Sequence, residues 1–427
     1  MSGVTESGVT ESGGVGSGSL GRRFGWLWAA YSVSTFGTRL AFDAFPLIAV
    51  VVLDAGTARV AALAAAGLAV GALVAVPLGP WVEFRRKRPV MVAMDLVRCV
   101  VLLSVPLAYA FDRLGFAQLL IVSVVVAAAD ITFRAAAGAC LKALVRPRDL
   151  LTANGRFEAT AWTATMLGPP VGGAAVGVFG PVVTVAVDAV SYLLSALEIR
   201  AIGGGEPCPR RADVPRLRAG DLLDGWRYVL AAPGLRPLFL NTVMVNGLIM
   251  ATTPLLAVLM LGDLGFAPWQ YGLAFAVPCA GGLVGSRLAR TLVARFGQHR
   301  VLVTSGVLRV CWPVGLAFVG PGTSGLVLVM VVEFGLITSI GVFNPVYATR
   351  RLDLTPTDRV ARTLSAWTVS GKLATAGLTA VWGLLAGLTG TRAAVALAGV
   401  LLLATPLLLP RQEQVSGRAL VEPASDR

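Results

Sequence analysis

Charged residues are scarce in this chain, and histidine is almost absent. Asp, Glu, Lys and Arg together make up 14% of the 427 residues, whereas hydrophobic residues make up 56%. A soluble domain of this length would need a far more charged surface, so we expect most of the chain to lie in lipid. His299 is the single histidine, which argues against a histidine metal site and a Ser-His-Asp triad.

The cysteines and the basic residues also lack the patterns of a soluble enzyme or a nucleic-acid binder. Four of the five cysteines lie in apolar runs and one in the central polar segment, without paired or metal-ligand spacing. We therefore expect no metal ion and no cofactor. The net charge of +13 comes from short basic clusters between apolar runs, without a recognition module for nucleic acid, so none is expected as a partner.

Twelve apolar runs are long enough to cross a bilayer, which takes about 20 mostly apolar residues. The predicted membrane helices are 25–53, 60–81, 89–111, 117–140, 153–178, 181–200, 237–261, 269–292, 300–320, 323–347, 362–388 and 392–410. The predicted fold class is therefore an all-α integral membrane protein with 12 transmembrane helices.

The remaining segments are predicted to be tails and a linker. Residues 1–23 are expected to form a disordered tail, because Gly and Ser dominate them. Residues 411–427 form the second tail. The segment 201–236 is the predicted linker, and its stretch 222–230 has the pattern of an amphipathic helix on the membrane surface.

Basic residues are distributed unevenly between the loops. Of the 36 Lys and Arg, 28 fall in the tails, the loops and the adjoining helix ends of one side, five deeper within helices, and three in the loops of the other side: Arg59, Arg113 and Arg392. Because cytoplasmic loops carry the excess of Lys and Arg, both termini are predicted to be cytoplasmic.

The two halves of the chain resemble each other at a nearly constant offset. Three pairs of segments match at offsets of 208 to 211 residues: 46–50 with 254–258, 147–149 with 356–358, and 90–98 with 301–309. This predicts the duplication of a six-helix unit and two pseudo-symmetric bundles, 24–200 and 237–410, an architecture found in transporters with parallel repeats.

The loop after the second predicted helix carries a charged motif. It reads GPWVEFRRKR from Gly79 to Arg88 and resembles the Gly-x-x-x-Asp-Arg-x-Gly-Arg-Arg loop of the major facilitator superfamily. Glu83 takes the acidic place, and Lys87 and Arg88 take the last two basic places, whereas Phe84 and Arg86 depart from the pattern. The resemblance implies a loop that clamps the two halves in one conformation. The alternative is a basic cluster that only sets the orientation.

Three charged residues near the cytoplasmic ends of the third and ninth predicted helices, Asp95, Arg98 and Arg309, are expected to belong to the same gate network. Arg98 and Arg309 are paired by the repeat.

The fifth predicted helix contains LGPPVGG, with Gly168, Pro169, Gly172 and Gly173. This is similar to the Gly-Pro-x-x-Gly-Gly signature of drug/proton antiporters in the same superfamily. Small residues let helices approach closely and proline bends a helix, which suits an interface between halves that rock. The alternative is simple tight packing. Segments 93–98, 188–192 and 355–362 resemble the macrolide-efflux and enterobactin-exporter branch, which implies proton-driven export of an antibiotic, siderophore or similar metabolite.

Polar residues inside the membrane carry the predicted chemistry, because each costs at least ~2.5 kcal/mol unless it has a partner or water. The resemblance implies that helices 1, 4, 7 and 10 line a central substrate cavity. These four hold Arg39, Asp43, Asp130, Arg134, Asn241, Asn246, Glu333 and Asn344. The two charged pairs in this set have i, i+4 spacing, so each can form an ion pair on one helix face, with either a functional or a structural role.

Four carboxylates are candidates for proton coupling. Glu333 has no opposite charge nearby in the sequence, so we expect it to exchange a proton readily. Glu333 and Asp43 are the first candidates, and Asp130 and Asp188 are the next. Lys372 is expected either to join the gate or cavity groups or to neutralise Glu333 across the bundle. Four tryptophans are expected to offer contact area to an apolar ligand: Trp162, Trp312, Trp367 and Trp382.

These features favour a monomeric secondary transporter of a bacterial inner membrane that exports a small organic compound by proton antiport. Import of a small polar nutrient is the alternative within the same class. A membrane-embedded enzyme is disfavoured, because no clustered acid-base or metal-type residues occur. A scaffold or sensor is disfavoured because the chain has no sizeable soluble segment.

Overall fold

The computed structural model describes residues 20–41, 44–53, 63, 67, 70, 71, 73, 74, 76–83, 85–203 and 223–410. Within these residues the secondary structure is helical and contains no strand. Most of the predicted tail 1–23, the tail 411–427, much of the predicted helix 60–81 and Asp43 lie outside the described residues.

The first bundle contains the helices up to residue 201. They are α1 Gly21–Leu40, α2 Ala44–Val51, α4 Leu78–Glu83, α5 Lys87–Ala110, α6 Phe116–Leu144, the short η1 Pro147–Asp149, α7 Leu150–Phe179 and α8 Pro181–Ala201. The predicted span 25–53 is thus covered by α1 and α2.

The second bundle follows a short surface helix, α9 Asp224–Ala231, which lies in the stretch predicted to be amphipathic. Its elements are α10 Leu235–Ala257, the π-helical η4 Val258–Asp263, α11 Pro268–Ala276, α12 Cys279–Phe296, α13 Gln298–Cys311, η5 Trp312–Phe318, α14 Gly322–Leu354, α15 Val360–Thr389, α16 Thr391–Ala404 and η6 Thr405–Leu408.

The internal repeat is visible in the helix ends. The helices α6 and α14 end 210 residues apart, and α7 and α15 begin and end 210 residues apart. Each of the latter two is followed by a glycine with positive φ, Gly180 at 80° and Gly390 at 88°, a conformation that residues with a Cβ rarely adopt. The prediction of two pseudo-symmetric bundles is therefore confirmed.

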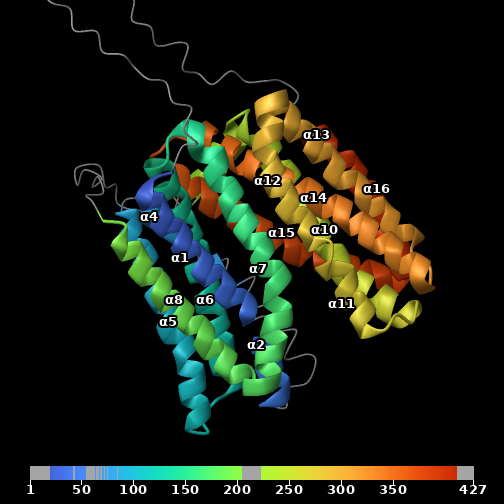
Figure 1. Ribbon diagram of the computed structural model, residues 1–427, viewed down its shortest axis with the longest axis horizontal. Coiled ribbons are helices and arrows are strands. Elements are labelled where there is room, and N and C mark those ends of the chain that lie inside the picture. Colours follow the sequence, from blue (N-terminus) through green and yellow to red (C-terminus); the bar gives the residue numbers. More distant parts are fainter. Residues whose placement is uncertain are drawn as a thin grey trace, which may run out of the picture.

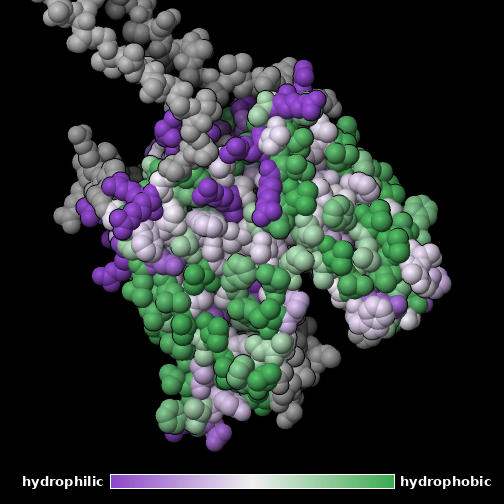
Figure 2. Space-filling view, in the orientation of Figure 1, coloured by the Kyte–Doolittle hydropathy of each residue, from purple (hydrophilic) through white to green (hydrophobic). Residues whose placement is uncertain are grey.

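The outer surface is apolar, as lipid requires. Leu384 and Leu388 of α15 are 74% and 86% exposed, and hydrophobic residues cover wide areas of the molecular surface (Figure 2). Among the described residues, nine helices are long and apolar enough to span a membrane. α7 is not among the nine because its stretch from Gly168 to Gly173 contributes little hydropathy. An all-α membrane protein is confirmed.

The two bundles lie side by side, with α1 to α8 in one and α10 to α16 in the other (Figure 1). Helix α7 packs against α12 and α14, and α4 and α6 pack against α15. The basic end of the molecule is the end at which α4 ends and at which α5, α7, α10, α13 and α15 begin. Hydrophilic atoms are concentrated towards this end, and the bundles are parted at the opposite end (Figure 2).

Candidate functional site

An ion cluster joins the two bundles at the basic end. Glu83, the last residue of α4, pairs with Arg362 near the start of α15, and the same guanidinium lies 3.1 Å from Asp224 of α9. Glu83 and Arg362 are 10% and 17% exposed. The acidic residue of the predicted clamp loop therefore contacts the other bundle through Arg362.

Burial raises the pKa of Glu83, which follows the predicted membrane span, from 4.5 to about 7, and the neighbouring Arg362 opposes this shift. The ion pair therefore offsets only part of the cost of removing the carboxylate from water.

The surface helix α9 is held closely against α15. A Cβ on Gly225 would lie 2.7 Å from the carbonyl oxygen of Arg362, so this position requires glycine. The Trp226 indole N–H donates to the Ser370 hydroxyl over 2.8 Å. Helix α9 is thus part of the closed basic end.

The two basic residues of the motif donate hydrogen bonds to backbone carbonyls of the first bundle. The Lys87 ammonium donates to the carbonyl oxygens of Val82 and Glu83, at 3.2 and 2.5 Å, and Arg88 donates to that of Gly203 at 2.6 Å. Cations bonded to such terminal carbonyls stabilise helix ends. Within the first bundle, their role is to hold α4 and the end of α8 in place beside Glu83.

Two further contacts close the basic end, and neither was predicted. Lys142, near the end of α6, donates to the carbonyl oxygens of Leu352 and Thr355 at the end of α14. The Asn154 amide of α7 donates to the Thr349 hydroxyl of α14 over 3.0 Å, and both residues are buried. Lys142 lies two residues beyond the predicted helix 117–140, and a basic residue next to a helix end was the available signal.

A buried ion network occupies the interior of the first bundle. Arg98, 3% exposed, pairs with Asp95, which accepts a 2.7 Å hydrogen bond from Ser195 of α8. The Arg98 guanidinium also lies 4.2 Å from the centre of the Tyr192 ring and 4.6 Å from that of Phe133. Asp95 and Arg98 thus fasten α5 to α6 and α8.

Asp130 connects this network to the second bundle. Its carboxylate lies 2.9 Å from Arg134, as the i, i+4 spacing predicts, 3.7 Å from Arg98 and 3.8 Å from Lys372 of α15. The expectation that Lys372 neutralises Glu333 is wrong, because α15 packs beside α6 and brings the ammonium to Asp130.

Asp188 and Glu333 lack a paired cation among the residues that the structure describes. Asp188 of α8 is 6% exposed and accepts hydrogen bonds from Thr38 of α1, at 3.3 Å, and from Ser191, at 3.4 Å. Glu333 of α14 is 7% exposed and has neither an ion pair nor a hydrogen bond within the described part of the chain.

The polar contact between α7 and α14 involves Glu158, which the sequence reasoning missed. Its carboxylate accepts hydrogen bonds from the Asn344 amide, at 2.7 Å, and the Trp162 indole, at 2.9 Å. Trp162 in turn lies against Gly282 of α12, where a Cβ would come within 2.2 Å of the ring. Asn344 therefore lies at the contact between the bundles. An isolated glutamate within the predicted helix 153–178 was the available signal.

Arg309 and Asn241 lie inside the second bundle. Arg309 donates to the Asn241 side-chain oxygen over 2.6 Å, and the Asn241 amide donates to the Thr405 carbonyl over 2.8 Å. Both are fully buried, and the guanidinium lies 3.6 Å from the centre of the Phe343 ring. Asn241 thus packs in the interior of the bundle instead of facing an open cavity, because its side chain is hydrogen-bonded to the buried Arg309.

The other predicted cavity residues have different surroundings. Arg39 at the end of α1 and Asn246 of α10 are exposed. Trp367 and Trp382 are buried within the second bundle, where Trp382 donates to the Ala394 carbonyl over 3.1 Å. These two indoles are core residues, contrary to the expectation of ligand contact. Trp312 packs against Gly335 of α14.

The glycine motif of α7 packs against α1 of the same bundle. A Cβ on Gly168 would lie 2.9 Å from the Arg39 carbonyl oxygen, and one on Gly172 would lie 2.2 Å from that of Leu40. A Cβ on Gly173 would meet no atom within 4 Å, and the side chain of Pro169 is outside the described residues. Two of the four motif residues therefore serve the close approach of α1 and α7.

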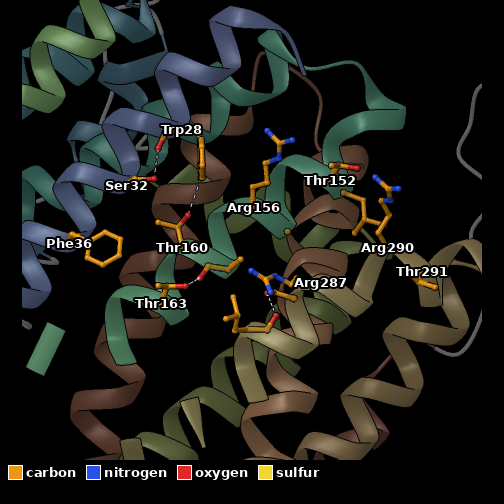
Figure 3. Close-up of a pocket in the computed structure, with 15 residues that line it drawn as sticks. Trp28, Ser32, Phe36, Thr152, Arg156, Thr160, Thr163, Arg287, Arg290 and Thr291 are labelled. Atoms are coloured by element: carbon orange, nitrogen blue, oxygen red, sulfur yellow. Dashed lines mark hydrogen bonds between the residues drawn. The ribbon is translucent and has the colours of Figure 1, made fainter. Parts of the chain in front are cut away.

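A cavity of about 680 Å³ lies where α1 and α7 face α12 (Figure 3). Aromatic and hydroxyl side chains line it, together with Arg156, Arg287 and Arg290. In the part of the chain that the structure describes, no cluster of three or more His, Cys, Asp or Glu side chains is placed to hold a metal ion.

Comparison with solved structures identifies the same fold in several transporters. A bacterial homologue of the iron transporter ferroportin in its outward-facing state gives a TM-score of 0.75 at 16% identity, over 91% of this chain and 98% of that one. The human organic anion transporter MFSD10 gives 0.74 at 15% identity, over 91% and 99%. The Escherichia coli fucose:proton symporter gives 0.70 at 13%, over 92% and 100%.

Two relatives in sequence carry the name multidrug efflux pump Tap. The protein from Mycobacterium tuberculosis is 29% identical over 198 residues, which is 45% of each chain, so the match spans less than half of that relative. The protein from Mycolicibacterium fortuitum is 26% identical over 312 residues, 70% of this chain and 74% of the relative. The family model described as Major Facilitator Superfamily matches residues 27–374. The chain therefore belongs to the major facilitator superfamily.

Proposed function

We propose that this protein is a secondary active transporter that exports a small organic compound by proton antiport with alternating access. The observation that carries the proposal is the arrangement of the bundles. Breakable polar contacts such as Glu83–Arg362 and Asn154–Thr349 join them at the basic end, and they are parted at the other end (Figure 2). Such an arrangement is one of the two end states that alternating access requires.

The proposed direction of transport rests on the orientation of the chain in the membrane and on the names of its relatives. The basic loops favour a cytoplasmic location for the basic end and for both termini, in a bacterial inner membrane. The described arrangement is then closed towards the cytoplasm. The name shared by the mycobacterial relatives, multidrug efflux pump, and the glycine motif of α7 both favour export over uptake.

The proton carrier is proposed from the distribution of charge. Asp130 is surrounded by three cations, so it is suited to hold α5, α6 and α15 together. Glu333 lacks any such partner among the described residues, so binding of a proton is a direct way to cancel its charge. A group whose charge changes as it faces the two sides in turn is what proton antiport needs. Asp43, Asp188 and Glu158 are the remaining candidates.

Transport by the purified protein in proteoliposomes tests this function. Ethidium and a panel of macrolides serve as probes, and an imposed pH gradient drives the exchange. We expect substrate to move against the direction of proton flow, with protein-dependent proton flux on addition of a transported compound. Movement of substrate in the same direction as protons would replace export by import, and transport insensitive to the gradient would exclude proton coupling.

A further inference from the structure

The cavity between α1, α7 and α12 has the composition of a site for an anionic amphiphile. Its apolar lining includes Trp28, Phe36 and Leu283, whereas Arg156, Arg287 and Arg290 supply three positive charges. Arg156 comes from the first bundle and the other two from the second, and all three lie around the same space (Figure 3).

None of these three arginines has an acidic partner among the residues that the structure describes. Arg156 has only aromatic neighbours, the rings of Phe24 and Trp28, each centred 5.9 Å from its guanidinium carbon. Some other arginines of the basic end are paired with nearby carboxylates, namely Arg146 with Asp149, Arg227 with Asp224, Arg359 with Asp358, and Arg362 with Glu83. The exposed Arg236, Arg295 and Arg300 also form no ion pair with a described residue, but they do not line this cavity with its apolar wall. An arginine does not lose its charge in a protein, so the groove carries a fixed positive charge.

The three charges act across the contact between the bundles. Beside them, a Cβ on Gly155 of α7 would lie 3.4 Å from the Ser286 carbonyl of α12, so the two helices approach closely here. Like charges on facing helices oppose this approach. An anion bound between Arg156 and Arg287 or Arg290 would remove the repulsion and link the bundles.

The depth of the groove matches a lipid of the leaflet at the basic end. Arg156 lies six residues from the start of α7, and Arg290 lies six residues from the end of α12, which places both about 9 Å along the helix axis. Thr163 and Leu283 lie 13 residues from the same ends, at a depth of about 20 Å. The groove therefore runs from near the headgroup layer towards the middle of the bilayer.

The groove also opens towards the lipid. Arg156, Arg287 and Arg290 are all exposed, and on the face drawn in Figure 2 hydrophilic atoms reach the surface between α7 and α12, above the hydrophobic lower part of the molecule. A lipid can enter such a groove sideways, with its headgroup at the arginines and an acyl chain on the apolar lining.

We propose that this groove binds an anionic phospholipid, with its phosphate between Arg156 and the pair Arg287 and Arg290. Guanidinium groups bind phosphate through paired charge-assisted hydrogen bonds. Phe36 and Leu283 then contact one acyl chain. Because the headgroup contacts both bundles, the bound lipid favours the arrangement that is closed at the basic end, whichever compound the protein transports.

Lipid retention by the purified full-length protein in a mild detergent tests the proposal. The probes are dioleoylphosphatidylglycerol and dioleoylphosphatidylcholine, titrated and counted by native mass spectrometry. The variant R156Q/R287Q/R290Q removes the three charges. The control R236Q/R295Q/R300Q removes three exposed arginines of the same end that lie outside the groove.

We expect the wild type and the control to bind phosphatidylglycerol tightly and phosphatidylcholine weakly. The groove variant should bind phosphatidylglycerol about 100-fold less tightly, because it loses the charge-assisted hydrogen bonds of three guanidinium groups to one phosphate. The variant R156K/R287K/R290K should recover most of the binding, which separates loss of charge from misfolding. Equal retention of phosphatidylglycerol by the groove variant and the control would overturn the proposal.

A second arm distinguishes a lipid from a soluble anion. Inorganic phosphate and glycerol 3-phosphate are added at millimolar concentration to the lipid-bound wild type. Because the acyl chain contacts the apolar lining of the groove and adds to the affinity, neither compound should displace the lipid. Displacement by either one would mean that the groove is a site for a soluble phosphate compound, and the lipid proposal would be wrong.

Discussion

Arg98 and Arg309 occupy equivalent positions in the two bundles, yet their surroundings differ. Arg98 pairs with Asp95 and lies 3.7 Å from Asp130. Arg309 has the neutral Asn241 side chain and the Phe343 ring, and no carboxylate among the described residues. Duplication preserved the position of the arginine, but the partners diverged.

The same contrast extends to the acidic groups. In the first bundle Asp95 and Asp130 are part of an ion network that reaches Lys372 of α15. In the second bundle Glu333 is buried without a cation within the described residues. The ion network of the first bundle therefore compensates its charges and stabilises packing, whereas Glu333 has neither a cation nor a hydrogen bond within the described residues. Asp188 and Glu158 differ from Glu333, because they accept hydrogen bonds from neutral groups. This is why we propose Glu333 as the proton carrier and assign structural rigidity to the network of Asp95, Arg98 and Asp130.

The largest expected effect is on the coupling of efflux to the proton gradient. We expect the substitution Glu333→Gln to abolish this coupling. The amide cannot release a proton, so efflux driven by an imposed pH gradient should fall to the rate without a gradient, while equilibrium binding of the substrate is retained. Asp112→Asn, in the exposed loop between α5 and α6, is the control and should transport normally. Full gradient-driven efflux in Glu333→Gln would move the proton carrier to another carboxylate, with Asp43 and Glu158 as the next variants.

The second test compares the two arginines directly. Arg98→Met leaves the buried Asp95 carboxylate without its cation and should destabilise the protein by about 3–5 kcal/mol. Arg309→Met removes a buried charge with no carboxylate partner and should cost less than about 2 kcal/mol. Thermal unfolding in detergent measures both. Adding Asp95→Asn to Arg98→Met should restore part of the loss. Equal destabilisation by the two single substitutions would contradict the contrast between the bundles.

The third test concerns the ion cluster where the bundles meet. The pKa of Glu83 is raised to about 7 in the closed arrangement, so that arrangement binds a proton more tightly than one in which Glu83 is in water. Lowering the pH from about 8 to about 5 should therefore favour closure of the basic end, by on the order of 2 kcal/mol.

Spin-label distances between positions 148 and 300 at the two pH values measure this closure. Glu83→Gln mimics the protonated carboxyl, so it should give the closed distance at both pH values, insert normally into the membrane and transport slowly. A wild type that opens as the pH falls would show that ionised Glu83 favours closure, and a Glu83→Gln variant that transports like the wild type would exclude the clamp role.

The smallest expected difference tests the symmetry of the repeat. Gly180 and Gly390 have nearly the same positive φ and no atom within 4 Å of an added Cβ. Alanine at either position should cost about 1–3 kcal/mol through backbone strain alone, because ψ of 162° and 153° places both glycines in a region that other residues rarely adopt. Thermal unfolding of Gly180→Ala and Gly390→Ala should show nearly equal losses, and a large difference between them would mean that the two turns are not equivalent.

Sequence alone predicted the features that depend on local composition and spacing. Long apolar runs predicted the membrane helices, the repeat predicted equivalent helix ends, and the i, i+4 spacing predicted the contact between Asp130 and Arg134. The loop motif predicted a contact across the bundles for Glu83, but not its partner. These inferences hold because lipid forces each spanning segment to satisfy its own backbone as a helix.

The tertiary structure decided which polar groups meet. Lys372 contacts Asp130 instead of Glu333. Glu158 accepts a hydrogen bond from Asn344 of the other bundle. Arg156 and Arg287 line the same groove from different bundles. The partners in each case lie on helices that are far apart in the chain. Their meeting depends on which face each helix turns to its neighbour, and hydropathy does not specify this face, because apolar side chains surround most of each helix.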